Sequence, residues 1–292
     1  MTPPVIKFTK MSASGNDFIV IDNLTAPEGE AFEVEPSFVR RVCGRKVAVG
    51  ADGVIVVSGS SAAHARMTYF NADGGRAALC GNGVRCVARL LVMRRVAPSD
   101  GLAIETDVGV LPAAVEGDKP WFRLPLGTPK IRRVSLDLPG GLDEISRHFE
   151  ATLVEAGVPH LVIETRDAHA MSEREFLSLA PRLRRHPDLG PEGANVDFFT
   201  LRDGHTLDIR CYERGVEGET LSSGSGCISA ALTVVNQEKG ESPVACRSRA
   251  GFTSTVTLMP GADGAMDAVL SGDARVIYTG VLHAEAMEEP SA

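Results

Sequence analysis

The sequence lacks several features that mark other classes of protein. Its 292 residues contain no apolar run near the ~20 that a membrane-spanning helix needs. Lys and Arg number 30 against 38 Asp and Glu, so the net charge is −8 and a nucleic-acid-binding surface is not expected. The N-terminal Met1-Thr2-Pro3-Pro4 leads straight into a strand-like segment and has no signal-peptide pattern. We therefore expect a cytoplasmic protein that binds neither nucleic acid nor membrane.

Cysteine is also scarce. Six cysteines in a chain of this length are too few for a disulfide framework. None of them has the Cys-x-x-Cys spacing that is typical of a zinc site. The sequence therefore predicts free thiols in a reducing compartment.

The length suits two domains of ordinary size. Residues 120–139 contain four prolines and no strong hydrophobic period, so we place the crossing between domains there. The expected N-terminal half is residues 1–122, to which residues 277–292 return. The expected C-terminal half is residues 123–276.

Both halves show the same alternation of short strands with one apolar helix. Strands are predicted from β-rich segments bounded by turns, at residues 6–9, 18–22, 54–57, 67–70, 103–106, 108–115, 161–164, 197–201, 206–212, 244–249, 253–259, 265–270 and 274–278. Helices are predicted at 81–93, 171–185 and 224–235, the second with Ser172 as N-cap and Glu175 in the capping-box position. This pattern predicts an α+β fold with two pseudo-symmetric halves, each a rolled, mostly antiparallel sheet around a central helix.

Two segments 143 positions apart spell nearly the same motif. Cys80-Gly81-Asn82-Gly83 and Ser223-Gly224-Ser225-Gly226 each place a small nucleophilic side chain before Gly-x-Gly and an apolar helix. The unpaired N–H groups of a helix start favour negative charge. Two such starts could hold a carboxylate, with one reactive group on each side of it.

Four segments in this order resemble the diaminopimelate epimerase family of cofactor-independent amino-acid racemases and epimerases. They are residues 10–18 (KMSASGNDF), 70–74 (FNADG), 79–86 (LCGNGVRC) and 212–221, with Tyr212-Glu213-Arg214-Gly215 and Glu219-Thr220-Leu221. The resemblance implies two similar halves with the reaction in the cleft between them. It implies inversion at one α-carbon of LL-diaminopimelate to the meso form, in lysine and peptidoglycan synthesis. It also implies no pyridoxal phosphate and no metal, an amino-acid substrate as ligand, and a homodimer.

The resemblance assigns roles position by position. Cys80 matches the first of two proton-transferring cysteines, and Ser223 stands at the second. Backbone N–H groups of Gly81, Asn82, Gly224 and Ser225 would hold the reacting carboxylate. Further positions match residues that recognise the amino and carboxylate groups of the substrate, namely Asn16, Asn71, Asn195, Glu213 and Arg214. His160 matches an accessory histidine near the site.

Ser223 departs from the family, because a serine hydroxyl needs an adjacent base before it can accept a proton. Four interpretations stay open: a replacement that traps substrate, a natural slow epimerase with one thiol, a relative that eliminates water or isomerises, and a thiol displaced to Cys227. The last is the least favoured, since one helical turn carries a side chain about 5.4–6 Å away. Cys227 is more simply a small buried hydrophobe.

A second departure concerns the far end of the substrate. Many relatives have an asparagine where this chain has Val158, whose side chain forms no hydrogen bond. The prediction is an epimerase of diaminopimelate, altered by Ser223. The alternatives are a related racemase or dehydratase with another substrate, or an amino-acid binder without turnover.

Overall fold

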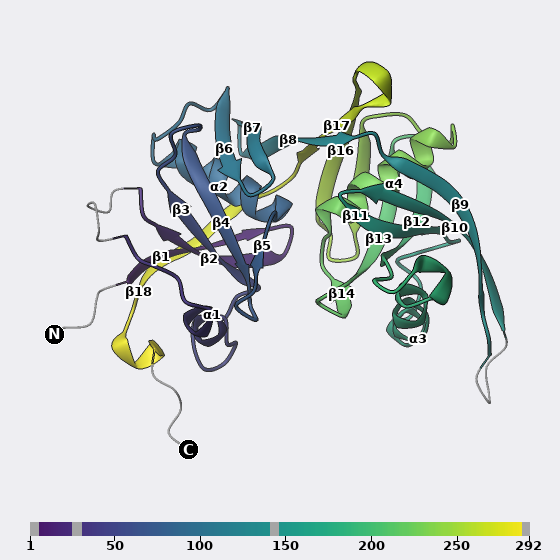
Figure 1. Cartoon of the computed structure of the whole chain (residues 1–292), viewed down its shortest axis with the longest axis horizontal. Helices are drawn as coiled ribbons and strands as arrows, with labels where there is room; N and C mark the ends of the chain where they lie inside the picture. The colour runs from purple at the N-terminus through teal and green to yellow at the C-terminus, as the bar shows by residue number, and fades with distance from the viewer. Residues whose placement is uncertain (1–5, 25–30, 141–145, 288–292) are drawn as a thin grey trace. The chain divides into compact units, whose positions relative to one another are not determined.

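The computed structural model describes residues 6–24, 31–140 and 146–287, which form two compact units (Figure 1). One unit contains the chain up to Phe122 and the segment from Ser271 onward, and the other contains Arg123–Leu270. The predictions made for Met1–Pro4 and for residues 288–292 lie outside the described residues.

The first unit is a sheet of strands wrapped on helix α2 (Gly81–Met93). Strand β1 pairs antiparallel with β2 and with β18; β2 pairs parallel with β3; β3 antiparallel with β4; β4 parallel with β6; and β6 antiparallel with β7. The strand bounds are β1 (Ile6–Ala13), β2 (Asn16–Asp22), β3 (Gly53–Ser58), β4 (Ala65–Asn71), β5 (Arg76–Ala77), β6 (Leu102–Thr106), β7 (Gly109–Glu116) and β18 (Arg275–Leu282). Helix α1 (Pro36–Val42) lies between β2 and β3 in the chain.

The second unit repeats this order of pairings around helix α4 (Gly224–Asn236). Strand β10 pairs antiparallel with β9 and β11; β11 parallel with β12; β12 antiparallel with β13; β13 parallel with β15; and β15 antiparallel with β16. The bounds are β9 (Lys130–Leu138), β10 (Arg147–Ala156), β11 (Val158–Glu164), β12 (Asn195–Asp203), β13 (Thr206–Glu213), β14 (Gly218–Thr220), β15 (Val244–Ser248), β16 (Thr253–Pro260) and β17 (Met266–Ser271). Helix α3 (Glu173–Arg184) occupies the place of α1.

The matching order confirms the predicted α+β fold of two similar halves. In each unit a short strand, β5 or β14, forms a hairpin with the strand before it and is followed by the central helix. The strand after the helix, β6 or β15, pairs in parallel with the first strand of that hairpin, β4 or β13. Apart from a few partly exposed positions, both central helices are buried along their length, as their apolar composition predicts. Cys80 and Ser223 therefore occupy the same topological position.

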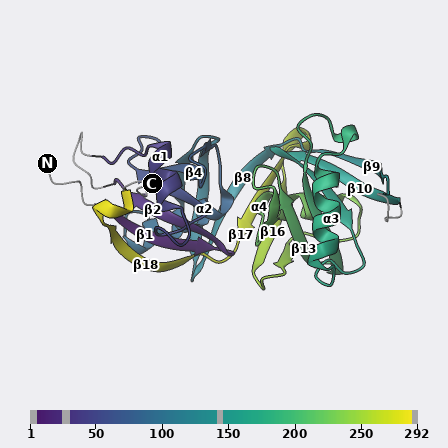
Figure 2. The ribbon, with the colours of Figure 1, turned by 90° about the horizontal axis from the view of Figure 1, so that it is seen from below.

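The outer helices cover the other face of each sheet. Phe38, Val39 and Val42 of α1 pack on Ile19 and Ile21 of β2. Helix α3 likewise packs Phe176, Leu179 and Leu183 over β12 and β13, and Figure 2 shows it lying along the strands of its unit. Ser172 caps α3 by accepting a hydrogen bond from the Glu175 backbone N–H at 3.1 Å, as predicted.

Residues 120–139, where the sequence places the crossing between domains, are strand for most of their length. They form most of β8 (Lys119–Gly127) and β9, and the chain passes from one unit to the other within β8. Pro125 lies beyond the part of β8 that pairs with β7, and Pro129 lies between the strands, so neither proline removes an N–H from the ladders of β7–β8 or β9–β10. Strand β10 and helix α1 were also not predicted.

Candidate active site

Cys80 and Ser223 are the N-cap residues of α2 and α4. Both have extended backbone angles, φ −134° and ψ 107° for Cys80, and φ −119° and ψ 117° for Ser223. Each is followed at once by a glycine that begins the helix. The first N–H groups of the two helices therefore lie beside a thiol in one unit and a hydroxyl in the other.

Amide groups surround the Cys80 thiol. The Cys80 Sγ donates to Asn16 Oδ1 at 3.8 Å, and the Asn82 Nδ2 donates to the same oxygen at 3.4 Å. Asn16 Nδ2 donates to the carboxylate of Asp52 at 2.7 Å. Because an amide oxygen only accepts, Cys80 in this arrangement is the protonated thiol.

Ser223 is bound differently. Its hydroxyl oxygen accepts from the Gly226 backbone N–H at 3.2 Å and lies 3.4 Å from the Ser225 Oγ. Its side chain is buried, with 4% of its surface exposed. This hydrogen bond is the capping contact that serine favours at a helix start.

A carboxyl group adjoins Ser223. Glu213 ends β13, and the β13–β14 hairpin brings the Thr220 hydroxyl to 2.8 Å from its Oε1. Burial raises the pKa of Glu213 above its ordinary value, and hydrogen bonds from Thr220 and Ser223 lower it by less. A carboxyl group with a raised pKa is a stronger base when ionised, and this one lies near enough to the Ser223 hydroxyl for that hydroxyl to affect its pKa.

A buried chain of polar groups lies beside these residues. The parallel register of β11 and β12 places His160 opposite Asn195. The Arg214 backbone N–H donates to Asn195 Oδ1 at 2.7 Å, which turns Asn195 Nδ2 toward His160 Nε2 at 3.1 Å. Nε2 must then accept, so the ring proton lies on Nδ1 and is donated to Asp197 at 2.6 Å. Both ring nitrogens of His160 are thus engaged within the protein.

The structure groups the sequence-predicted residues within each unit. Asn16, Asn82 and Gly81 adjoin Cys80, whereas Asn71 lies exposed at the end of β4. In the second unit, the predicted residues around Ser223 and the His160 chain are Glu213, Asn195, Gly224, Ser225, His160 and Arg214.

Three functional neighbours were not predicted from the sequence. Asp52 and Asp197 orient Asn16 and His160, and Thr220 binds Glu213. Asp197 had a signal, since it is a carboxylate between Val196 and two phenylalanines of β12. The Arg214 side chain lies 3.5 Å from the exposed Glu192.

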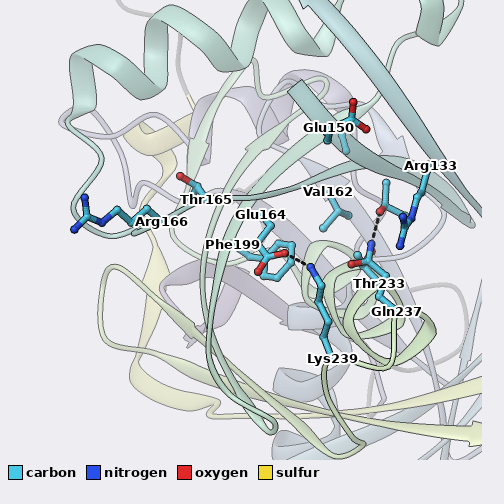
Figure 3. Close-up of a pocket in the computed structure, with 12 residues that line it drawn as sticks. Arg133, Glu150, Val162, Glu164, Thr165, Arg166, Phe199, Thr233, Gln237 and Lys239 are labelled. Carbon is cyan, nitrogen blue, oxygen red and sulfur yellow. Dashed lines mark hydrogen bonds and ion pairs between the residues drawn. The ribbon is translucent and has the colours of Figure 1, made fainter. Parts of the chain in front are cut away.

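A separate cavity of about 560 Å³ opens in the second unit, at the other end of α4 (Figure 3). Gln237 donates to the Thr152 hydroxyl at 3.0 Å, and Lys239 pairs with Glu164. Thr233, which lines the cavity, lies ten residues along α4 from Ser223, or ~15 Å at 1.5 Å per residue. The described residues that line the cavity include none of the predicted site residues.

Within the described part of the chain, no three His, Cys, Asp or Glu side chains are grouped as metal ligands. No helix among the described residues is long and apolar enough to span a membrane.

Comparisons with known proteins identify the family. A family model described as diaminopimelate epimerase matches residues 8–131 and 152–275. A diaminopimelate epimerase of Archaeoglobus fulgidus is 40% identical over 233 residues, covering 77% of this chain and 80% of that protein. One of Desulforudis audaxviator is 32% identical over 286 residues, covering 94% and 98%.

The chain belongs to the diaminopimelate epimerase family. Among solved structures, a hydroxyproline epimerase from Agrobacterium vitis with bound trans-4-hydroxy-L-proline has a TM-score of 0.69 at 15% identity, covering 96% of this chain and 93% of that one. A phenazine biosynthesis protein of the PhzF family from Bacillus anthracis has a TM-score of 0.71 at 16% identity, covering 96% and 99%. At this identity these structures show a shared fold.

The first turn of α4 leaves no room for a side chain at Gly226. A Cβ there would lie 2.6 Å from Asp197 Oδ1 and 2.9 Å from Cys211 Sγ. We expect Gly226→Ala to lower the free energy of unfolding by about 1–3 kcal/mol, because overpacking forces the helix away from β12 and β13. Urea denaturation measures this.

Gly204→Ala is the matched control, since a Cβ there meets nothing within 4 Å. Its unfolding free energy is expected to stay within about 0.5 kcal/mol of the parent. Equal stability of the two variants would contradict the close approach of α4 to Asp197.

Proposed function

We propose that this protein inverts the α-carbon of LL-diaminopimelate to the meso form, with Ser223 and Glu213 replacing the second catalytic thiol. Family membership supports the reaction class and the substrate. The observation that carries the altered chemistry is a buried carboxyl group of raised pKa near Ser223. The reaction uses neither pyridoxal phosphate nor metal.

The starts of the two central helices supply the electrostatics. Backbone N–H groups of Gly81 and Asn82, and of Gly224 and Ser225, bind the α-carboxylate. As the α-proton leaves, negative charge spreads toward that carboxylate, and fixed N–H donors stabilise it without having to reorient. This is how an enzyme without an electron-withdrawing cofactor can lower the barrier to carbanion formation.

Two acid–base groups then exchange protons with the carbon. On one face, Ser223 accepts the α-proton while its own hydroxyl proton passes to the Glu213 carboxylate, so the C–H bond breaks and the carboxyl becomes protonated. On the other face, the Cys80 thiol donates its proton to the carbanion and becomes a thiolate. The reverse reaction uses the same groups in opposite roles. The thiol state of Cys80, donating to Asn16, is the one required for the first direction.

Restoring a thiol at position 223 tests this account. We expect Ser223→Cys to raise the rate of α-proton exchange with heavy water at least about tenfold at neutral pH, since a thiol of pKa ~8.5 ionises far more readily than a hydroxyl. The measurement is NMR of diaminopimelate incubated with each protein.

Ser222→Cys serves as the matched control, because it adds a thiol one position before the helix cap. Its exchange rate should equal that of the parent. No exchange by the parent or by Ser223→Cys, despite binding of diaminopimelate, would identify an amino-acid binder and overturn the proposal.

Glu213 should set the acid limb of the pH–rate profile. Because its pKa is raised, the carboxylate form of the parent is lost as pH falls through that value, and the rate should fall with it. Glu213→Gln is expected to lower kcat by about 10²–10⁴-fold, the usual range for losing a general base. Steady-state kinetics from pH 5 to 9 measures both.

The exposed Glu155 provides the comparison, since its pairing with Lys130 lies on the surface. Glu155→Gln should keep the parental profile. A Glu213→Gln variant with parental kcat would exclude Glu213 as the base.

We further propose a cytoplasmic homodimer. The six cysteines are all free, five of them buried, which suits a reducing compartment. Strand β18 exposes three apolar side chains, Ile277 at 53%, Tyr278 at 45% and Val281 at 58%. Such a patch on a strand is typical of a surface that another subunit covers.

A charged side chain on the exposed surface of β18 should separate the subunits. Ile277→Lys is expected to halve the mass measured by light scattering, because a desolvated ammonium at the interface opposes association. Val108→Lys, at another exposed valine (50%), should leave the mass unchanged. A dimer that persists in Ile277→Lys would place the interface elsewhere.

A further inference from the structure

Five residues after Cys80, α2 places a cation inside the first unit. The Arg85 side chain is fully buried, with 0% of its surface exposed. Burying a guanidinium costs several kcal/mol unless hydrogen bonds and compensating charge replace its hydration. The contacts of Arg85 therefore indicate what it does there.

The Arg85 guanidinium reaches two side chains near the start of the helix. Its Nη2 donates to Asn82 Oδ1 at 2.6 Å and to Ser14 Oγ at 2.9 Å. Ser14 in turn donates its backbone N–H and its hydroxyl to Asp273 Oδ1 at 2.9 and 3.1 Å. Through this hydroxyl Arg85 is linked to the Asp273 carboxylate, and the shorter of its two Nη2 bonds is the one to Asn82.

The bond to Asn82 determines the orientation of two amides. A guanidinium only donates, so the Asn82 atom that faces it is the oxygen, and the Asn82 amide nitrogen is turned toward Asn16 Oδ1. Asn16 is oriented the same way from its other end, because its nitrogen donates to Asp52. Asn16 Oδ1 therefore receives both the Asn82 N–H and the Cys80 thiol.

We propose that Arg85 is a positioning residue for Cys80: through Asn82 it holds and polarises the amide that competes with the thiol for Asn16 Oδ1. A cation bound to the Asn82 oxygen makes its N–H a stronger donor, because hydrogen bonds in a chain polarise one another. The thiol bond to Asn16 is weakened, so the thiol releases its proton more readily. This inference rests on the proposed function, in which Cys80 gives up and regains a proton.

The carboxylates around this cluster have cations of their own. Asp52 pairs with Arg45 at 2.7 Å, and Asp273 with Arg275 at 2.8 Å. Asp17, beside Asn16, pairs with Lys10 at 2.7 Å and with Arg45 at 2.6 Å. Arg89, one turn further along α2, points to the surface and donates to the Asp118 carbonyl. Arg45 thus reaches Asn16 through the Asp52 carboxylate, whereas Arg85 reaches it through the neutral Asn82 amide.

Alkylation of Cys80 tests the inference without any substrate. Cys80 is the only half-buried cysteine among the six described ones, and the other five are buried. Burial raises the pKa of the Cys43 thiol to about 12 and raises that of Cys86, while burial and a hydrogen bond with Cys227 raise that of Cys246. Iodoacetamide should therefore add once to the folded protein, and intact mass spectrometry counts the additions.

The decisive variant is Arg85→Gln. The pH midpoint of Cys80 alkylation should move up by about one unit, in line with the loss of a nearby opposite charge. Exchange of the substrate α-proton should fall about tenfold. Arg85→Lys, which keeps the charge and one donor for Asn82, should restore most of both, and Arg89→Gln should keep the parental midpoint.

Two outcomes overturn the inference. One is a singly alkylated Arg85→Gln protein with the parental midpoint. The other arises if Arg85→Gln is alkylated more than once, which means that it has unfolded. Asn82→Ala is then the test: an upward shift of the pH midpoint of Cys80 alkylation supports the role of Arg85, and an unchanged midpoint overturns it. A shifted midpoint in a protein that never exchanges the α-proton would reject the proposed function and leave the role of Arg85 intact.

Discussion

The structure depends on how closely the first turn of each central helix approaches its sheet. At Gly226 of α4 the nearest atoms are a fixed carboxylate oxygen and a sulfur, 2.6 and 2.9 Å from where a Cβ would lie. At Gly83 of α2 the neighbours are flexible ends of Ile55 and Met67 side chains, at 3.0 and 3.3 Å. Glycine at these positions lets the helix start sit inside the roll with its N–H groups beside the reactive side chain. In α4 the second glycine of the Gly-x-Gly motif therefore has a steric origin.

The same backbone carries different chemistry in the two units. Around Cys80 the groups are the Asn16 and Asn82 amides, with the Arg85 guanidinium bound to Asn82. In the proposed reaction they hold the thiol while it gives up and regains its proton. Around Ser223 they are a carboxyl, two hydroxyls and the Asp197–His160–Asn195 chain. A hydroxyl is a poor base alone, so the proposed reaction depends on the raised pKa of Glu213 in the second unit. In that proposal a thiol acts on one face of the carbon and an oxygen base on the other.

The repeated order of elements could be predicted from the sequence because apolar periodicity and turn residues are local signals. The central helices and the Ser172 cap are examples. Strands β8 and β9 were not predicted, because prolines at 125 and 129 suggest breaks; only the structure shows that Pro125 lies beyond the pairing with β7 and Pro129 between the strands. Strand β10 was not predicted either. Helix α1 has only seven residues, too short for a period to show.

The site was predictable to a similar degree. Sequence motifs singled out Cys80 and Ser223, and the structure shows the cap geometry that they share. The prediction that Cys227 packs as a small buried residue is confirmed by its 2% exposure. The roles of Arg85, Asp52 and Asp197 were not predicted, because they depend on partners far away in the chain. Examples are Ser14 for Arg85 and His160 for Asp197. Such partners are a property of the fold.

The central claim, that two different groups serve the two faces of one carbon, is tested most directly by following label in heavy water from LL-diaminopimelate alone. In the first few per cent of turnover, the account predicts that newly formed meso product carries deuterium at the inverted carbon while recovered LL substrate carries none. Equal labelling of substrate and product from the earliest times would mean that a single group removes and returns the proton, and would contradict the account.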